Sequence, residues 1–143
     1  MTQEKNNGLY SGNERGAEIK RDVYKGFTYK ILDMGTHPCA YVQIPKDHML
    51  YNVGYDSIRI DVHGGLTYAG LGKGKEEGEY WIGWDYAHLG DYYDHDKITT
   101  VSGDKKWTIP EIEKHCREVI DQILKIKKFQ KGEYYYATHE RDY

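Results

Sequence analysis

The sequence predicts an α+β fold: a mainly antiparallel sheet of about five or six strands, with one long C-terminal helix packed across one face. Short segments rich in β-branched and aromatic residues recur along much of the chain, and residues 58–63 alternate strictly between apolar and polar side chains. One amphipathic segment with an N-terminal capping signal begins near residue 108. These observations together favour one sheet covered by one helix.

The predicted strands follow from local composition. Val23–Leu32 mixes β-forming residues around Gly26, and Pro45 ends the short strand Ala40–Ile44. The alternation of Ile58–His63 is typical of a strand with one apolar and one polar face. Three further segments complete the prediction: Leu66–Ala69, the aromatic Glu79–Asp85 and, as an edge strand, Glu133–Ala137.

The helix is predicted from its first turn. Thr108 and Glu111 have the spacing of a capping box, and Pro110 is tolerated at a helix start because its missing N–H needs no partner there. Apolar residues then recur at helical spacing and predict a single buried stripe: Ile112, Cys116, Val119, Ile120, Ile123 and Leu124.

Length and charge limit the organisation and the partners. The 143 residues fit one domain, expected over residues 17–138, between a flexible arm (1–16) and a frayed tail (139–143). A net charge of −3 is poorly suited to binding long nucleic acids. No apolar run approaches the roughly 20 residues of a membrane helix. We therefore expect the protein to bind neither a long nucleic acid nor a membrane, whereas a homo-oligomer is compatible with the sequence.

The cysteines and the N-terminus indicate the compartment. The first sixteen residues lack the hydrophobic core of a signal peptide. Cys39 and Cys116 lie far apart without CxxC spacing, so reduced thiols in a cytosolic protein are the simplest interpretation.

Two segments concentrate polar chemistry, Asp61–Gly70 and Trp81–Asp91. On the first, Arg59, Asp61 and His63 share one face of the predicted strand because side chains alternate between faces. On the second, Asp85, His88 and Asp91 recur every third residue and would cluster on one side of a helical turn. We therefore expect a small-ligand site formed by both segments.

The residue types leave four interpretations open. The carboxylates and imidazoles could bind a metal ion, or His63, His88 and Asp85 could act as metal-free acid and base. They could instead only recognise a ligand, with Trp81, Trp84 or Tyr86 stacking on a base and with Thr67 and Tyr68 in contact. The fourth interpretation is structural. HExxH and CxxC motifs are absent, so we expect no metal and no cofactor.

Two smaller signals lie nearby. His37 and Cys39 could form a base–nucleophile pair, although a cysteine directly before an apolar strand more often packs in the core. Lys73 and Lys75, within the glycine-rich Gly70–Gly78, could close over phosphates together with Arg59. The phosphate-loop motif GxxxxGK[ST] is absent, so we expect no Walker-type NTPase.

Several segments resemble a bacteriophage and prophage family of uncharacterised small proteins. Val62–Tyr68 reads VHGGLTY, and Trp81–Asp91 reads WIGWDYAHLGD, close to the family's HGGLTY and WxGFDxAHxGD. Trp84 and Tyr86 stand where the family has Phe and Cys. The resemblance covers about Cys39–Asp91 and the terminal helix, and it implies a viral accessory protein in the host cytoplasm.

The resemblance implies a role against host defence. The leading interpretation is capture of a small nucleotide-derived immune signal, of the cyclic oligonucleotide or cyclic ADP-ribose type. One alternative is a hydrolase, a phosphodiesterase or nuclease, that degrades the same signal with the His/Asp groups. Another is direct binding of a host defence protein through exposed tyrosines. Family likeness alone does not decide between them.

Overall fold

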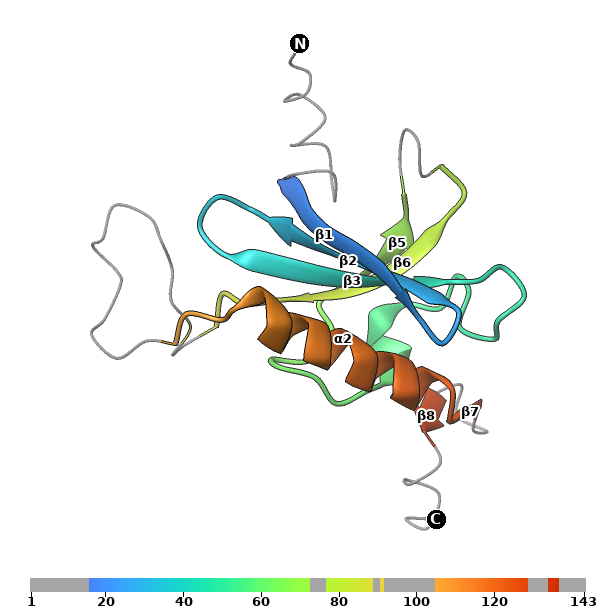
Figure 1. Cartoon of the computed structure of the whole chain (residues 1–143). Coiled ribbons are helices and arrows are strands. Elements are labelled where there is room, and N and C mark those ends of the chain that lie inside the picture. Colours follow the sequence, from blue (N-terminus) through green and yellow to red (C-terminus); the bar gives the residue numbers. More distant parts are fainter. Residues whose placement is uncertain (1–15, 73–76, 89–90, 92–104, 129–133, 137–143) are drawn as a thin grey trace.

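The computed structural model describes residues 16–72, 77–88, 91, 105–128 and 134–136. A five-stranded sheet in the order β1-β2-β3-β6-β5 forms the centre of the molecule, and every pairing within it is antiparallel. Figure 1 shows the helix α2 lying across one face of this sheet. The predicted α+β class is therefore confirmed. Its elements are β1 (Ala17–Tyr24), β2 (Phe27–Asp33), β3 (Pro38–Ile44), β5 (Tyr68–Leu71), β6 (Tyr80–Asp85) and α2 (Ile109–Ile123).

The first two strands form a tight hairpin. The turn consists of Lys25 and Gly26, which have φ values of 49° and 87°. Positive φ at both positions is the requirement of a type I′ turn, whose twist matches that of the flanking strands. The β-forming segment that the sequence places around Gly26 is thus split between β1 and β2, and pairing begins at Tyr24 and Phe27.

The helix begins as predicted. The Thr108 side chain accepts from the Glu111 amide, and the Glu111 side chain accepts from the Thr108 amide. Five of the six stripe residues are buried: Ile112, Cys116, Val119, Ile120 and Ile123. Leu124, predicted as the sixth, is 51% exposed. The helix ends at Ile123, and Leu124 is its C-cap, with helical φ and ψ and an amide that donates to the Ile120 carbonyl. Leu124 therefore continues the helical path but lies at the exposed edge of the stripe.

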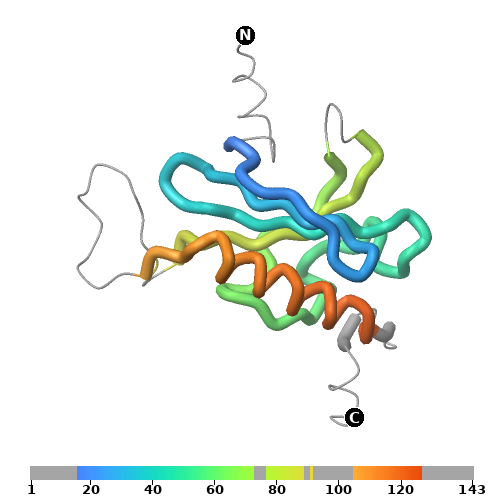
Figure 2. Tube along the Cα trace, viewed as in Figure 1, coloured from blue at the N-terminus to red at the C-terminus, as the bar shows by residue number. Residues whose placement is uncertain are grey.

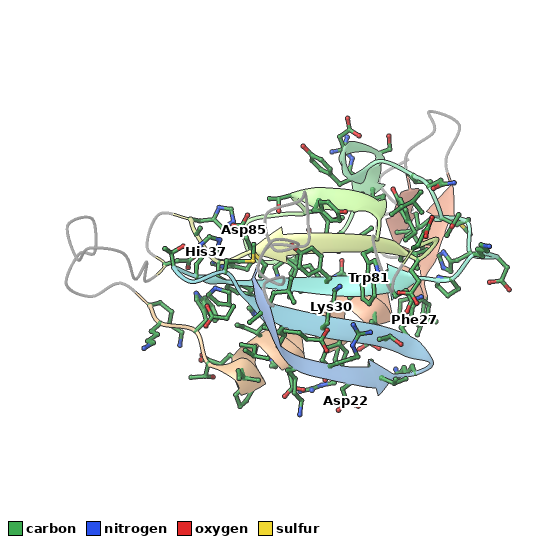
Figure 3. All side chains as sticks on the ribbon, turned by 90° about the horizontal axis from the view of Figure 1, so that it is seen from above. Asp22, Phe27, Lys30, His37, Trp81 and Asp85 are labelled. Atoms are coloured by element: carbon green, nitrogen blue, oxygen red, sulfur yellow. The ribbon has the colours of Figure 1, made fainter. Side chains whose placement is uncertain are left out.

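The two faces of the sheet are covered differently. Alternate side chains of β2, β3 and β6 pack with the helix in the main core. The side chains that point to the other face of the sheet form a second cluster of Leu32, Cys39, Tyr41 and Trp81. Figure 3, viewed onto this second face, shows Lys30 and Trp81 near its middle, and the Lys30 Nζ lies 4.2 Å from the Trp81 ring centroid.

The segment predicted as the strand Ile58–His63 is mostly not a strand. Only β4 (Ile58–Arg59) pairs, after the short 3-10 helix η2 (Tyr55–Ser57). The next residues run along the helix, where the Asp61 amide donates to Gln122 Oε1 and the Asp61 carbonyl accepts from Gln122 Nε2, both at 2.7 Å. The tube in Figure 2 shows this green segment beside α2. The side-chain amide of Gln122 therefore takes the place of the neighbouring strand that the alternation predicts.

A second, three-stranded sheet closes the C-terminal end of the helix, in the order β4-β8-β7. Its other strands are β7 (Ile126–Lys128) and β8 (Tyr134–Tyr136). The strand expected within Glu133–Ala137 therefore exists, but it pairs with β4 and β7 instead of forming an edge of the main sheet. No helix in the described part of the chain is long and apolar enough to span a membrane.

Candidate functional site

The site lies at one end of the main sheet, where the two polar segments meet. Nε2 of His63 donates to the Asp91 carboxylate at 2.8 Å, which joins residues 28 positions apart. Asp85 ends β6, and Figure 3 shows it beside His37 at that end of the sheet. The rings of His63 and His88 lie 5.5 Å apart. Four predicted site residues, His63, Asp85, His88 and Asp91, are thus brought together.

Asp91 is the centre of this arrangement. Its side chain is only 3% exposed, and besides His63 it accepts from the His88 amide at 3.0 Å and from Trp107 Nε1 at 2.8 Å. Burial opposes ionisation, but these donors outweigh it and leave the pKa of Asp91 below its ordinary value. Asp91 is therefore an anion that orients the three groups around it.

This anion also determines the tautomer of His63. An ionised carboxylate can only accept, so Nε2 of His63 carries a proton. In the neutral ring the lone pair is then on Nδ1. Among the described residues, Nδ1 makes no hydrogen bond, and the His63 side chain is 24% exposed. Nδ1 can therefore serve as the acceptor, or the base, of this pair.

His88 lies next to Asp85 in a different geometry. Its Nε2 is 3.1 Å from Asp85 Oδ1, but the two are not aligned as a hydrogen bond, and this buried nitrogen has no partner within the described chain. Asp85 is oriented separately, by the Ala87 amide at 3.2 Å and by the Thr67 hydroxyl at 3.4 Å. The His88 ring rests on Gly64, where a Cβ would overlap it.

Behind these groups lies a ring cluster that the sequence analysis missed in part. Tyr86 stacks on His63 with centroids 5.0 Å apart, and Trp107 packs within 5.5 Å of His63, Tyr86 and His115. Trp84 Nε1 donates to the Tyr86 hydroxyl, which donates in turn to His115 Nδ1 at 2.7 Å. Burial lowers the pKa of His115, which favours the neutral ring that this chain of bonds requires.

His115 and Trp107 lie far along the chain from both polar segments. His115 follows Ile112 by three positions, so the stripe periodicity could have placed it on the inner face of the helix. Trp107 directly precedes the helix cap, and its sequence neighbours carry no signal for a contact with Asp91.

Several residues expected to meet a ligand lie elsewhere. The proposed stacking residues Trp81, Trp84 and Tyr86 are 0%, 1% and 0% exposed, so their faces are covered by protein instead of being open to a base. Tyr68 packs against Tyr41 in the second cluster, with ring centroids 5.6 Å apart. Of the expected stacking residues, Tyr86 is the one in contact with His63, and its ring stacks on one face of the imidazole.

The row of Arg59, Asp61 and His63 depended on a strand that continues through His63. Arg59 belongs to β4 and pairs with β8, while the Asp61 backbone is held at Gln122. The His63 ring lies near the His115 ring of α2, with centroids 6.4 Å apart. The expected strand would have aligned these side chains in one row. Lys73 and Lys75 lie outside the described residues.

Two further expectations concern cysteine and metal. Cys39 is buried, and burial raises its pKa to about 12, so it is a core thiol and not a nucleophile at neutral pH. Over the described ranges, no group of three His, Cys, Asp or Glu side chains is placed to hold a metal ion.

A cavity of about 260 Å³ adjoins the ring cluster, and Tyr86 and Trp107 belong to both. Its rim includes His37, whose pKa is lowered by burial and whose Nδ1 lies 2.8 Å from the Thr36 hydroxyl. Comparisons of the chain with protein-family models, with curated proteins and with solved structures find no match. The chemistry of the site therefore rests on its own geometry.

Proposed function

We propose that this protein captures a small nucleotide-derived signal, of the cyclic oligonucleotide or cyclic ADP-ribose type, and that it acts as a phage-encoded anti-defence protein in the host cytoplasm. The observation that carries the proposal is the placement of two partly exposed imidazoles beside two carboxylates, His63 hydrogen-bonded to Asp91 and His88 in close contact with Asp85. The phage origin and the host compartment rest on the sequence resemblance.

Preorganisation supports binding at this position. Asp91, Tyr86 and Trp107 hold the His63 ring before any ligand arrives, so little side-chain entropy is lost when a ligand binds. His63 offers an acceptor at Nδ1, and Asp85 offers carboxylate oxygens at the surface of the site. Ribose hydroxyls and base amino groups are suitable donors to such acceptors.

A second candidate is hydrolysis of the same kind of signal. The specific observation in its favour is the proximity of two imidazoles with centroids 5.5 Å apart, of which one has a fixed tautomer. A base and an acid so placed could take a proton from the attacking group and return one to the leaving group. Release of an intact ligand supports capture, whereas conversion of many ligands per chain supports hydrolysis.

The sharpest test uses the two adjacent glycines at the site. Gly64 and Gly65 have φ values of 70° and 81°, so an alanine at either should cost a similar backbone strain of about 1–2 kcal/mol. A Cβ on Gly64 would overlap the His88 ring, whereas nothing lies within 4 Å of a Cβ on Gly65. We expect Gly64→Ala to abolish ligand capture and Gly65→Ala to retain it at equal thermal stability.

The assay is mass spectrometry of the small molecules released by denaturing protein purified from cells with an active nucleotide-based defence. His63→Ala and His88→Ala should also return no nucleotide. Since His63 satisfies a buried carboxylate, its variant should additionally lose about 1–3 kcal/mol of stability. Equal nucleotide recovery from Gly64→Ala and Gly65→Ala would contradict the proposal. Wild-type protein that returns no nucleotide would also contradict it.

A further inference from the structure

The cavity beside the ring cluster has walls of two kinds. It lies between the β2–β3 turn, the β1 strand and the start of α2, and it is lined by Ile19, Ile109, Ile112, Trp107, His37 and Lys106, among others. The isoleucines and the indole make much of it apolar. His37, Lys106 and the nearby Asp33 add a few polar groups. Apolar walls with a small number of placed polar groups are the usual composition of a small-molecule site.

The aromatic wall is held in place. Trp107 Nε1 donates to the buried Asp91, and its ring is tilted by 54–57° against Tyr86, His63 and His115. Trp107 differs from the other two tryptophans, because Trp81 and Trp84 are fully buried while Trp107 is partly exposed. The cavity therefore contains a flat indole that cannot turn away without losing a charge-assisted hydrogen bond.

The size of the cavity limits what can enter. Pockets for drug-sized ligands span roughly 300–1,000 Å³, and this cavity of about 260 Å³ is smaller. One ring system with its sugar is on this scale, and a whole cyclic oligonucleotide is not. Lys105 Nζ lies over the Trp107 ring, 5.0 Å from its centroid. A planar ring would gain contact area by stacking on the indole once this exposed lysine side chain moves aside.

We infer that this cavity is a nucleobase subsite, which takes one base of the ligand against Trp107 while the ribose hydroxyls lie outside, toward His63 and Asp85. The inference rests on the proposed function and specifies its ligand: a nucleotide with at least one base free to enter this cavity. Because Asp91 binds both Trp107 and His63, one carboxylate positions the base wall and the polar groups together.

The first experiment fills the cavity. Ile109 lines it and is 37% exposed, so Ile109→Trp can place a ring there without removing a hydrogen bond of the site. Leu124→Trp is the matched control, since Leu124 is 51% exposed just beyond the far end of the same helix and is not part of the lining. Calorimetric titration would use a panel of cyclic dinucleotides, cyclic trinucleotides and cyclic ADP-ribose.

Loss of at least tenfold in affinity for Ile109→Trp, with Leu124→Trp like wild type, is the expected result. Equal affinity for both variants would overturn the base subsite and leave the proposed function standing. No binding of any panel member to wild type would overturn both.

A second measurement needs no variant that fills the cavity. Acrylamide quenching of wild-type tryptophan fluorescence reports mainly Trp107, because the other two indoles are buried. The bound nucleotide should reduce this quenching, and Trp107→Phe should remove most of the nucleotide-dependent change. Quenching that is unchanged by a saturating nucleotide would show that the base lies elsewhere.

Discussion

The Asp91 carboxylate gathers donors from three separate parts of the chain: the His63 ring, the His88 amide and the Trp107 indole. Each donor comes from a different element or loop, so one buried side chain sets the relative positions of all three. An amide in place of this carboxylate would keep the size but would turn an NH₂ group toward at least one donor.

We predict that Asp91→Asn destabilises the protein by about 1–3 kcal/mol, because a buried donor loses its acceptor. Equilibrium unfolding in urea measures this change. Asp47→Asn is the control, since Asp47 is exposed in a turn and surface substitutions usually stay within about 0.5 kcal/mol. Equal midpoints for the two variants would mean that the three donors find other acceptors.

At the scale of the element, the helix depends on its first turn. The Thr108–Glu111 capping box satisfies amides that have no partner within the helix. Lys105 Nζ lies 2.7 Å from Glu111 and lowers the pKa of this carboxyl to about 2, together with the Thr108 amide. The same turn carries Trp107 and Ile109 to the cavity, so the cap positions both a helix and a binding wall.

We predict that Thr108→Ala lowers the free energy of unfolding by about 1 kcal/mol and that Thr108→Ser restores most of it, since serine retains the capping oxygen. Thermal unfolding followed by circular dichroism provides the measurement. If serine were as unstable as alanine, the methyl group and not the cap would be responsible.

At the scale of the whole molecule, acidification acts on several buried groups in the same direction. Burial lowers the pKa of His37, His48 and His115 from an ordinary 6.5, so the unfolded chain takes up protons before the folded one does. Stability from these histidines is complete above pH 6.5 and is lost as the pH falls through their folded pKa values. Asp91, whose pKa lies below its ordinary 3.8, adds a further loss at lower pH.

The melting temperature should therefore fall as the pH is lowered from 7.5 to 5. The dependence of the melting temperature on pH should be weaker in His115→Gln, because glutamine cannot take up the proton. Differential scanning calorimetry in buffers of constant ionic strength would measure both slopes. A melting temperature that rises on acidification would contradict the assignment of a neutral His115.

Local rules determined much of the fold from the sequence. The capping box and the stripe from Ile112 to Ile123 require only residues a few positions apart, and both are present in the structure. The aromatic β6 strand and the short β3 strand likewise follow from composition. The sequence also indicated His63, Asp85, His88 and Asp91 as one group, because their residue types recur in two short segments.

Only the tertiary structure decided what each side chain faces. Alternation assigns side chains to two faces, but it does not say that both faces of this sheet are covered, as they are at Trp81 and Trp84. Nor does it show that a glutamine of the helix takes the place of a strand partner at Asp61. Trp107 and His115 join the site through contacts across 16 and 29 residues. Such contacts form when separate elements pack, and no local spacing encodes them.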